Sequence, residues 1–137
     1  MFDTLAIGSI GETQLVVAQE HTAAHLGSGL LPVLATPQMI ALMEGAAVEA
    51  VARAIPEGYQ TVGIALDVRH LAATPIGGQV TARAELIEID RAKLTYRVEA
   101  FDAAGKIGEG QHQRFVVEVA RFMRGADKRA AAEGDGS

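Results

Sequence analysis

ATPQMIALMEGAAVEAVARAI, residues 35–55, is the longest stretch of the chain dominated by apolar residues. It predicts a helix that begins at Thr36, whose hydroxyl is suited to cap the first turn. Pro37 then occupies the first helical position, where no N–H is needed. Pro56 and Gly58 end the helix. Apolar or small side chains point in nearly every direction around it, which is typical of a buried helix.

One carboxylate on this helix, Glu44, has no oppositely charged residue at helical spacing. Its near neighbours on the helix are Ile40, Ala47 and Val48. A carboxylate among apolar side chains is costly unless another group bonds it. Because desolvation also makes a carboxylate more basic, Glu44 is a candidate catalytic group.

Length and composition fit one globular domain. The 137 residues are 49% hydrophobic and 21% charged, with no cysteine, which excludes disulfides and thiolate chemistry. The net charge of −5 argues against a protein that binds nucleic acid or an anionic membrane. No charge-free apolar run reaches the ~18 residues of a membrane span. The N-terminal sequence, MFDTLAIGSIGE, does not resemble a signal peptide, so we expect a cytoplasmic protein.

After the helix, the hydrophobic period changes to two residues, as in strands. In TVGIALDVRH, residues 61–70, this alternation predicts one buried face that carries Val62, Ile64, Leu66, Val68 and His70. Further strands are predicted over residues 12–20, 79–89, 94–101 and 107–121. We expect a loop over residues 21–31, a single domain over residues 1–121, and a partly disordered tail over residues 122–137.

This order of elements predicts an α+β fold. Strands joined by short turns make an antiparallel sheet, on which the helix packs as a second layer. Because the predicted helix is apolar all round, one sheet face cannot bury it. Either the sheet wraps around the helix or a partner subunit covers the rest.

Three segments carry a resemblance to a known family. They are ATPQMIALMEGAAVEAV (residues 35–51), GIALDVRHLAATPIG (residues 63–77) and GEGQHQRFVVEV (residues 108–119). The combination of T-x7-E on a helix with H-x-A-A-T-P after a strand is more specific than either motif alone. Together the segments resemble the fluoroacetyl-CoA thioesterase-like family of the hotdog-fold thioesterase superfamily.

The resemblance implies a hotdog fold, in which an antiparallel sheet wraps around one long central helix, and it implies thioester hydrolysis. The family's catalytic threonine, glutamate and histidine match Thr36, Glu44 and His70. Its substrate-contacting glycine and arginine match Gly63 and Arg114.

The sequence departs from the family at the acyl pocket. The fluoroacetyl-specific member carries phenylalanines just before the helix that form a lid over the pocket. Here that segment reads HLGSGLLPVLAT, with Gly27 and Leu30 at the equivalent places. Leu30 is therefore a candidate substrate-contacting residue, but the aromatic lid is missing.

Thioester hydrolysis needs an attacking group, stabilisation of the oxyanion and a proton for the leaving thiolate. Glu44 is the candidate attacker, either directly as a nucleophile or through a water molecule, and the sequence leaves both open. His70 is the candidate proton carrier. The helix N-terminus at residues 36–38 offers free N–H groups and a positive dipole to an oxyanion, with the Thr36 hydroxyl beside them.

The leading interpretation is a thioesterase that acts on a short-chain or small acyl-CoA. Two alternatives stay open: a non-catalytic hotdog protein that binds a small acyl or aromatic ligand, and a hotdog hydratase or dehydratase. No metal or separate cofactor is expected, because the histidines lack ligand spacing. His21, His25 and His112 are interpreted as loop or surface residues. Candidates for holding the CoA phosphates are Arg69, Arg91, Lys93, Arg121 and Arg124.

The spacing of the candidate catalytic residues bears on assembly. Thr36 and Glu44 are eight residues apart, which is ~12 Å along a straight helix. Both can reach one carbonyl only if Thr36 lies in a loop that folds back, or if the two meet across a subunit boundary. We expect a homodimer with two equivalent, shared sites.

The missing lid leads to a prediction about selectivity. We expect this chain to prefer fluoroacetyl-CoA over acetyl-CoA by less than ~10-fold in kcat/KM. One small substituent adds little binding free energy in a pocket without dedicated contacts to it. Parallel kinetics with the two substrates measure the ratio. A preference of several thousand would show that other residues supply the discrimination.

Overall fold

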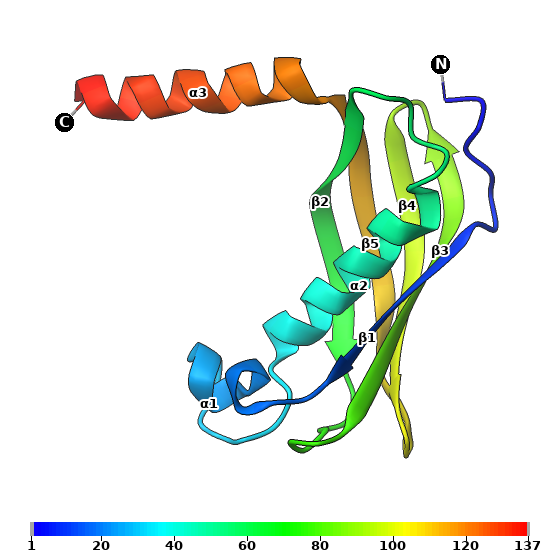
Figure 1. The fold of residues 1–137 in the computed structure, drawn as a ribbon, viewed down its shortest axis with the longest axis vertical. Coiled ribbons are helices and arrows are strands. Elements are labelled where there is room, and N and C mark those ends of the chain that lie inside the picture. Colours follow the sequence, from blue (N-terminus) through cyan, green and yellow to red (C-terminus); the bar gives the residue numbers. More distant parts are fainter. Residues whose placement is uncertain (1, 137) are drawn as a thin grey trace.

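A curved, five-stranded antiparallel sheet holds a long helix, α2, across its concave side (Figure 1). The structure is a computed structural model and describes residues 2–136. In spatial order, the strands are β1 (Ile10–Val16), β3 (Gln79–Asp90), β4 (Lys93–Asp102), β5 (Gly105–Glu118) and β2 (Tyr59–His70). The helical segments are η1 (Gln19–His21), α1 (Ala23–Leu26), α2 (Thr36–Val51) and α3 (Val119–Gly136). This arrangement confirms the predicted α+β architecture.

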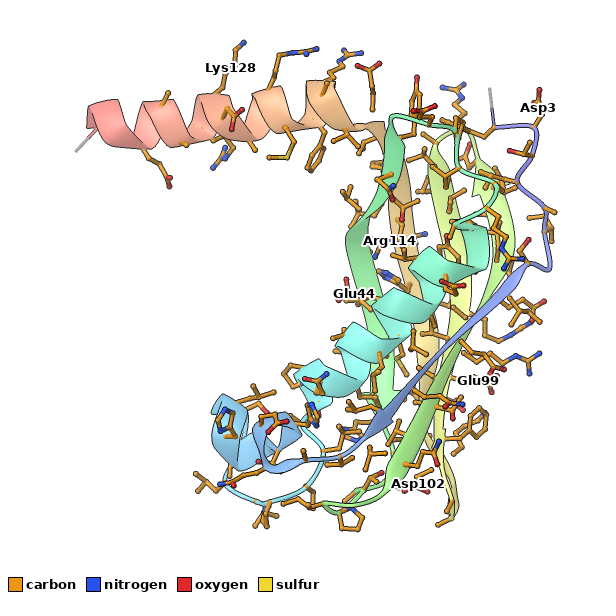
Figure 2. The ribbon with its side chains drawn as sticks, viewed as in Figure 1. Asp3, Glu44, Glu99, Asp102, Arg114 and Lys128 are labelled. Atoms are coloured by element: carbon orange, nitrogen blue, oxygen red, sulfur yellow. The ribbon has the colours of Figure 1, made fainter. Side chains whose placement is uncertain are left out.

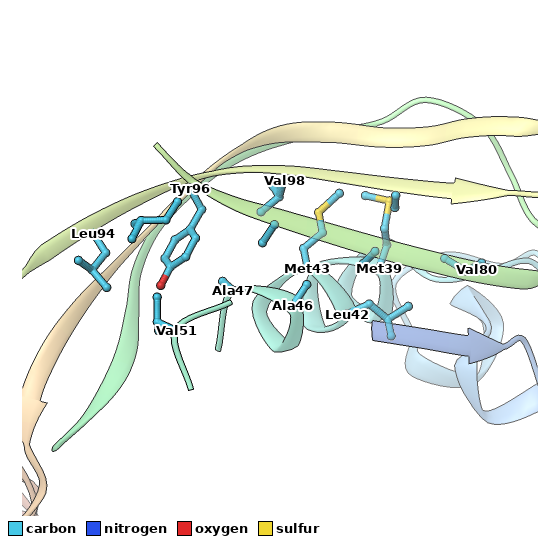
Figure 3. Packing of buried hydrophobic residues seen from close by; sticks show 14 of the residues in the cluster. Met39, Leu42, Met43, Ala46, Ala47, Val51, Val80, Leu94, Tyr96 and Val98 are labelled. Carbon is cyan, nitrogen blue, oxygen red and sulfur yellow. The ribbon is translucent and has the colours of Figure 1, made fainter. Parts of the chain in front are cut away.

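The core lies between one face of α2 and the inner faces of β3 and β4 (Figure 3). From α2 it takes Met39, Leu42, Met43, Ala46, Ala47 and Val51. From the strands it takes Val80, Ala82, Ala84 and Leu86, and Leu94, Tyr96 and Val98. The strands supply these residues at every second position, as the sequence predicts.

The opposite face of α2 is open in a single chain. Val48 is 38% exposed, and Ala41 and Glu49 are also exposed. The sheet therefore covers only part of this apolar helix.

β1 approaches α2 closely at Gly11. A Cβ atom on Gly11 would collide with the carbonyl oxygen of Ala46 and the backbone of Ala50. Two residues later, the Thr13 hydroxyl donates a hydrogen bond of 2.7 Å to the Leu42 carbonyl. Because β1 also pairs with β3, this contact ties α2 to the edge of the sheet.

A β-bulge changes the inward face of β2. The register of β2 against β5 shifts between Gly63 and Ala65, so Ile64 is the extra residue. Gly63 lies opposite Arg114, and beyond the bulge His70 lies opposite Gly108. The predicted unbroken alternation from residue 62 to residue 70 is therefore wrong, since the inward face is odd-numbered before the bulge and even-numbered after it.

The apolar residues of β2 are also less buried than predicted. β2 is an edge strand of this sheet, and Ile64 and Leu66 are 44% and 42% exposed. The alternation of the sequence indicated a strand correctly, but not whether one chain alone would bury its apolar face.

Several element boundaries differ from the expected ones. The main helix ends at Val51, four residues early, and the predicted loop over residues 21–31 contains α1. The last strand ends at Glu118, and α3 follows it where a partly disordered tail was expected. In Figure 1, α3 extends away from the sheet. Among residues 2–136, no helix is long and apolar enough to cross a membrane.

The close approach at Gly11 leads to a stability prediction. Gly11→Ala should lower the free energy of unfolding by about 2 kcal/mol or more, because the methyl group would force β1 away from α2. Gly125→Ala in α3 is the control, since nothing lies within 4 Å of the added Cβ. It should be neutral or stabilise by up to ~1 kcal/mol. Urea denaturation of both variants measures the difference, and equal stabilities would contradict the packing described.

Candidate active site

Glu44 has a partner that the sequence did not reveal by local spacing. Its Oε2 lies 3.6 Å from Nη1 of Arg114, which reaches across from β5 (Figure 2). The Glu44 side chain is 39% exposed, whereas that of Arg114 is 8% exposed. The carboxylate thus has a buried cation on one side and an open approach on the other.

Arg114 is fixed on several sides. Its Nε–H donates to the Thr61 hydroxyl and its Nη2 to the Thr61 carbonyl oxygen, both at 2.9 Å. Nη1 lies 3.0 Å from Nε2 of His112. Burial lowers the pKa of Arg114, and the Glu44 carboxylate opposes that effect. These bonds fix the orientation of the guanidinium and hold its positive charge close to the Glu44 carboxylate.

Gly63 leaves room for this cluster. A Cβ atom on Gly63 would lie 3.0 Å from Oε2 of Glu44 and 3.3 Å from Nη1 of Arg114. The β-bulge turns Gly63 toward the inner face of the sheet, opposite Arg114. The structure therefore brings together three of the predicted site residues: Glu44, Gly63 and Arg114.

His112 belongs to the same cluster, and its interpretation as a loop or surface residue is wrong. It is 1% exposed, and its Nδ1 lies 2.8 Å from the Ala65 carbonyl oxygen. Burial lowers the pKa of His112, as does the nearby Arg114 cation, while the Ala65 carbonyl and Glu44 oppose the shift. Its position two residues before Arg114 on one strand was the signal in the sequence, since such residues share a face.

Thr36 and His70 form a second, separate pair. The Thr36 hydroxyl and His70 Nδ1 share a hydrogen bond of 2.8 Å. Thr36 is not the N-cap, because Ala35 occupies that position and Thr36 is the first residue of α2. Burial lowers the pKa of His70, partly offset by the backbone of Ala72. His70 Nε2 is buried without a hydrogen-bond partner among the described residues.

The first turn of α2 offers fewer donors to an oxyanion than expected. Pro37 has no N–H, and the N–H of Gln38 already donates to the Ala35 carbonyl oxygen at 3.0 Å. Among the described residues, the backbone N–H of Thr36 and its hydroxyl, which shares a hydrogen bond with His70, remain as donors at this helix end.

Within one chain, the two groups of predicted residues stay apart. Thr36 and Glu44 both lie on the unbroken helix α2, eight residues from each other. Their backbones are therefore ~12 Å apart along the helix axis. Thr36 is helical, so the alternative in which it folds back from a loop toward Glu44 is wrong for this chain.

The sequence over residues 17–120 matches the family model described as fluoroacetyl-CoA-specific thioesterase. The chain belongs to this family. It is 36% identical over 128 residues to the fluoroacetyl-CoA thioesterase of Streptantibioticus cattleyicolor, a match that covers 89% of this chain and 92% of that relative. Membership confirms the predicted family and places the chain among the thioester hydrolases.

Solved structures agree with this placement. The chain has a TM-score of 0.86 with a threonine-to-serine mutant of the fluoroacetyl-CoA thioesterase in complex with acetyl-CoA, at 33% identity and over 91% of this chain and 98% of that one. A hot-dog-like protein from Thermanaerovibrio acidaminovorans has a TM-score of 0.84 at 22% identity, over 93% and 94% of the two chains. The second match bears on the fold alone, and it supports the hotdog fold.

The segment before α2 carries Gly27 and Leu30 at the two positions where the sequence comparison expected lid residues. Leu30 is 92% exposed on the loop between α1 and α2. A shallow cleft of about 320 Å³ lies beside the Thr36–His70 pair. It is lined by Ala23, Ser28, Val33, Leu34, Leu71, Ala72 and Ala73. Leu30 is not part of this lining, so its substrate contact stays a prediction.

The site geometry predicts the effect of adding a side chain at Gly63. Gly63→Ala should lower kcat by ~10-fold or more while the chain stays folded, because the methyl group would push the Glu44 carboxylate off its position. Gly45→Ala is the control, since its added Cβ would meet only Thr13, at 3.3 Å. Steady-state kinetics and thermal unfolding of both variants measure the effects. Equal kcat values in the two variants would contradict the geometry.

Proposed function

We propose that this protein hydrolyses a short-chain or small acyl-CoA to the free acid and coenzyme A. The observation that carries the proposal is the Glu44 carboxylate, paired at 3.6 Å with the buried Arg114 guanidinium yet 39% exposed. A structural relative binds acetyl-CoA, which gives the class of substrate. No cofactor beyond the substrate is needed for this chemistry.

Glu44 is the attacking group of the proposed mechanism. The adjacent Arg114 cation is the counter-charge of this carboxylate, which can act as a nucleophile or as a base. Direct attack on the thioester carbon would form an anhydride that water then hydrolyses. In the other route Glu44 takes a proton from water, which attacks the thioester carbon and gives the acid without a covalent enzyme intermediate. Both routes stay open.

Thr36 and His70 serve the departing thiolate and the oxyanion. The Thr36 side chain is exposed, so its hydroxyl can contact the substrate, with His70 behind it at 2.8 Å. In its protonated form His70 would give its Nδ1 proton to the Thr36 oxygen as the hydroxyl proton passes to the leaving thiolate. The neutral imidazole left behind would then take up a proton from water. The Thr36 N–H would donate to the oxyanion.

A homodimer would join the two groups at one substrate. The exposed residues Ile64 and Leu66 on edge strand β2, and Val48 on α2, offer an apolar surface to a second copy. A two-fold axis at this edge would place the first turn of one α2 near the middle of the other, and would do so twice. Each site would then combine Glu44, Gly63 and Arg114 of one chain with the Thr36–His70 pair of its partner.

The remaining partners follow from the substrate. Coenzyme A phosphates require basic side chains near the site, and the five candidates named from the sequence stay predictions. Binding of nucleic acid or of a membrane is not part of the proposal, and the proposed compartment is the cytoplasm. The two alternative functions are separated by their products, because neither a binding protein nor a hydratase releases a thiol.

The role of Glu44 is tested by thiol release. Glu44→Gln should keep the fold and lower the release of free thiol from acetyl-CoA by ~10²-fold or more, as loss of a base or nucleophile usually does. Glu49→Gln, an exposed change on the same helix, should keep the wild-type rate. A thiol reagent reports the product. Wild-type turnover in Glu44→Gln would remove the carboxylate from the mechanism.

The shared site is tested by mixing inactive chains. Dimers that combine a Thr36→Ala chain with a Glu44→Gln chain should recover about one working site per mixed dimer, because one site receives both intact residues. Tandem affinity tags isolate the mixed dimer before the assay. Demonstrably mixed dimers without activity would contradict the shared site, and so would a protein that is monomeric at working concentration.

A further inference from the structure

The hydrogen bonds of His112 define its tautomer. Nδ1 lies 2.8 Å from the Ala65 carbonyl oxygen, which only accepts, so Nδ1 carries the hydrogen. Nε2 lies 3.0 Å from Nη1 of Arg114, which only donates, so Nε2 presents its lone pair. Only a neutral imidazole with hydrogen on Nδ1 satisfies both contacts.

The same Arg114 nitrogen faces both His112 and Glu44. Nη1 is 3.0 Å from His112 Nε2 and 3.6 Å from Glu44 Oε2. The other two nitrogens of the guanidinium, Nε and Nη2, are engaged by Thr61. His112 therefore supplies the closer of two acceptors that face Nη1. The position of its ring affects the distance and direction from Nη1 to the Glu44 carboxylate.

Besides Arg114, two contacts hold the imidazole ring in place. Tyr96 on β4 stacks against it, with ring centroids 6.3 Å apart and an interplanar angle of 28°. Ala65 directly follows the bulge in β2, so its bond to His112 joins β2 and β5 beside Gly63. The ring thus connects the bulge, the guanidinium and the carboxylate.

We propose that His112, as the neutral Nδ1–H tautomer, is a positioning residue for Glu44 and acts by orienting Arg114. The proposal rests on the proposed function, because it assumes that Glu44 performs the attack. His112 itself does not touch the substrate. Its Nε2 accepts from Nη1 and so holds that nitrogen of the guanidinium within 3.6 Å of the Glu44 carboxylate.

The surroundings of His112 favour this neutral form. The charged and titratable groups that face it are Arg114 on its own strand, Glu44 on α2 and Tyr96 on β4. Burial lowers the pKa of His112, and burial raises the pKa of Tyr96 to about 12, so both rings are neutral near pH 7. A protonated His112 would turn an N–H toward Nη1 and break the bond.

The sign of the pH effect on stability follows from this shift. The unfolded histidine takes up a proton near its ordinary pKa of about 6.5, whereas the folded one does so only at lower pH. The unfolded state therefore binds more protons in that interval, and stability is lost as the pH falls below about 6.5. His70, whose pKa burial also lowers, contributes in the same direction.

Two variants of His112 test its two hydrogen bonds one at a time: one keeps the acceptor for Arg114, and the other keeps the donor to Ala65. In His112→Gln the side-chain oxygen can replace Nε2 as acceptor for Arg114, while in His112→Asn the amide nitrogen can replace Nδ1 as donor to Ala65. Each variant loses one hydrogen bond and the ring stack, so a merely structural role predicts similar kcat values. We expect kcat of the Asn variant to be ~10-fold or more below that of the Gln variant, as loss of a bond to a charged group implies.

The outcomes distinguish this inference from the proposed function. Equal kcat values in the two folded variants, alongside an inactive Glu44→Gln, would overturn only the role of His112. Full activity in Glu44→Gln would overturn the proposed function. Imidazole ¹⁵N NMR of the wild-type protein gives a second readout that needs no variant to fold. Hydrogen on Nδ1 with a bare Nε2 supports the inference, and the opposite tautomer overturns it.

Discussion

A guanidinium inside a protein has to be hydrogen-bonded and paired, and this constraint shapes the candidate active site. Arg114 is 6% exposed and finds its partners on two strands and one helix: Thr61 on β2, His112 on β5 and Glu44 on α2. Two features of β2 make these contacts possible. Thr61 must face inward before the bulge, and Gly63 must lack a side chain.

The same constraint accounts for the carboxylate on an otherwise apolar helix. The sequence shows Glu44 without a partner at helical spacing, and the partner turns out to come from the last strand. Because α2 lies across the concave side of the sheet, a residue 70 positions later can reach it. The pairing balances the negative charge of Glu44 with the Arg114 cation and still leaves the carboxylate accessible to a substrate. Either route of thioester attack requires this accessibility.

The sequence predicted the central helix, the strands and the inner faces of β3 and β4, because periodicity records burial on one side. It did not predict the extra residue at Ile64, since a bulge leaves no mark in an apolar alternation. His112 was missed for a related reason. A histidine between polar residues suggests solvent, although its spacing of two from Arg114 places both side chains on one face of the strand. The folded sheet shows that this face is the buried one, with His112 paired to Leu66 and bonded to Arg114. Thr36 was selected by family resemblance, and its catalytic role stays a prediction, but the expected capping position is taken by Ala35.

In the proposed dimer, one thioester meets Glu44 of one chain and Thr36 of the other. α2 is unbroken from Thr36 to Val51, so no rearrangement of loops brings the two residues of one chain together. A crystal structure of the Glu44→Gln protein with acetyl-CoA tests this most directly. We expect a dimer in which the thioester carbon lies within van der Waals distance of the substituted side chain of one chain, while its oxygen accepts a hydrogen bond from Thr36 of the other. A thioester bound wholly within one chain, away from the partner's Thr36, would contradict the shared site.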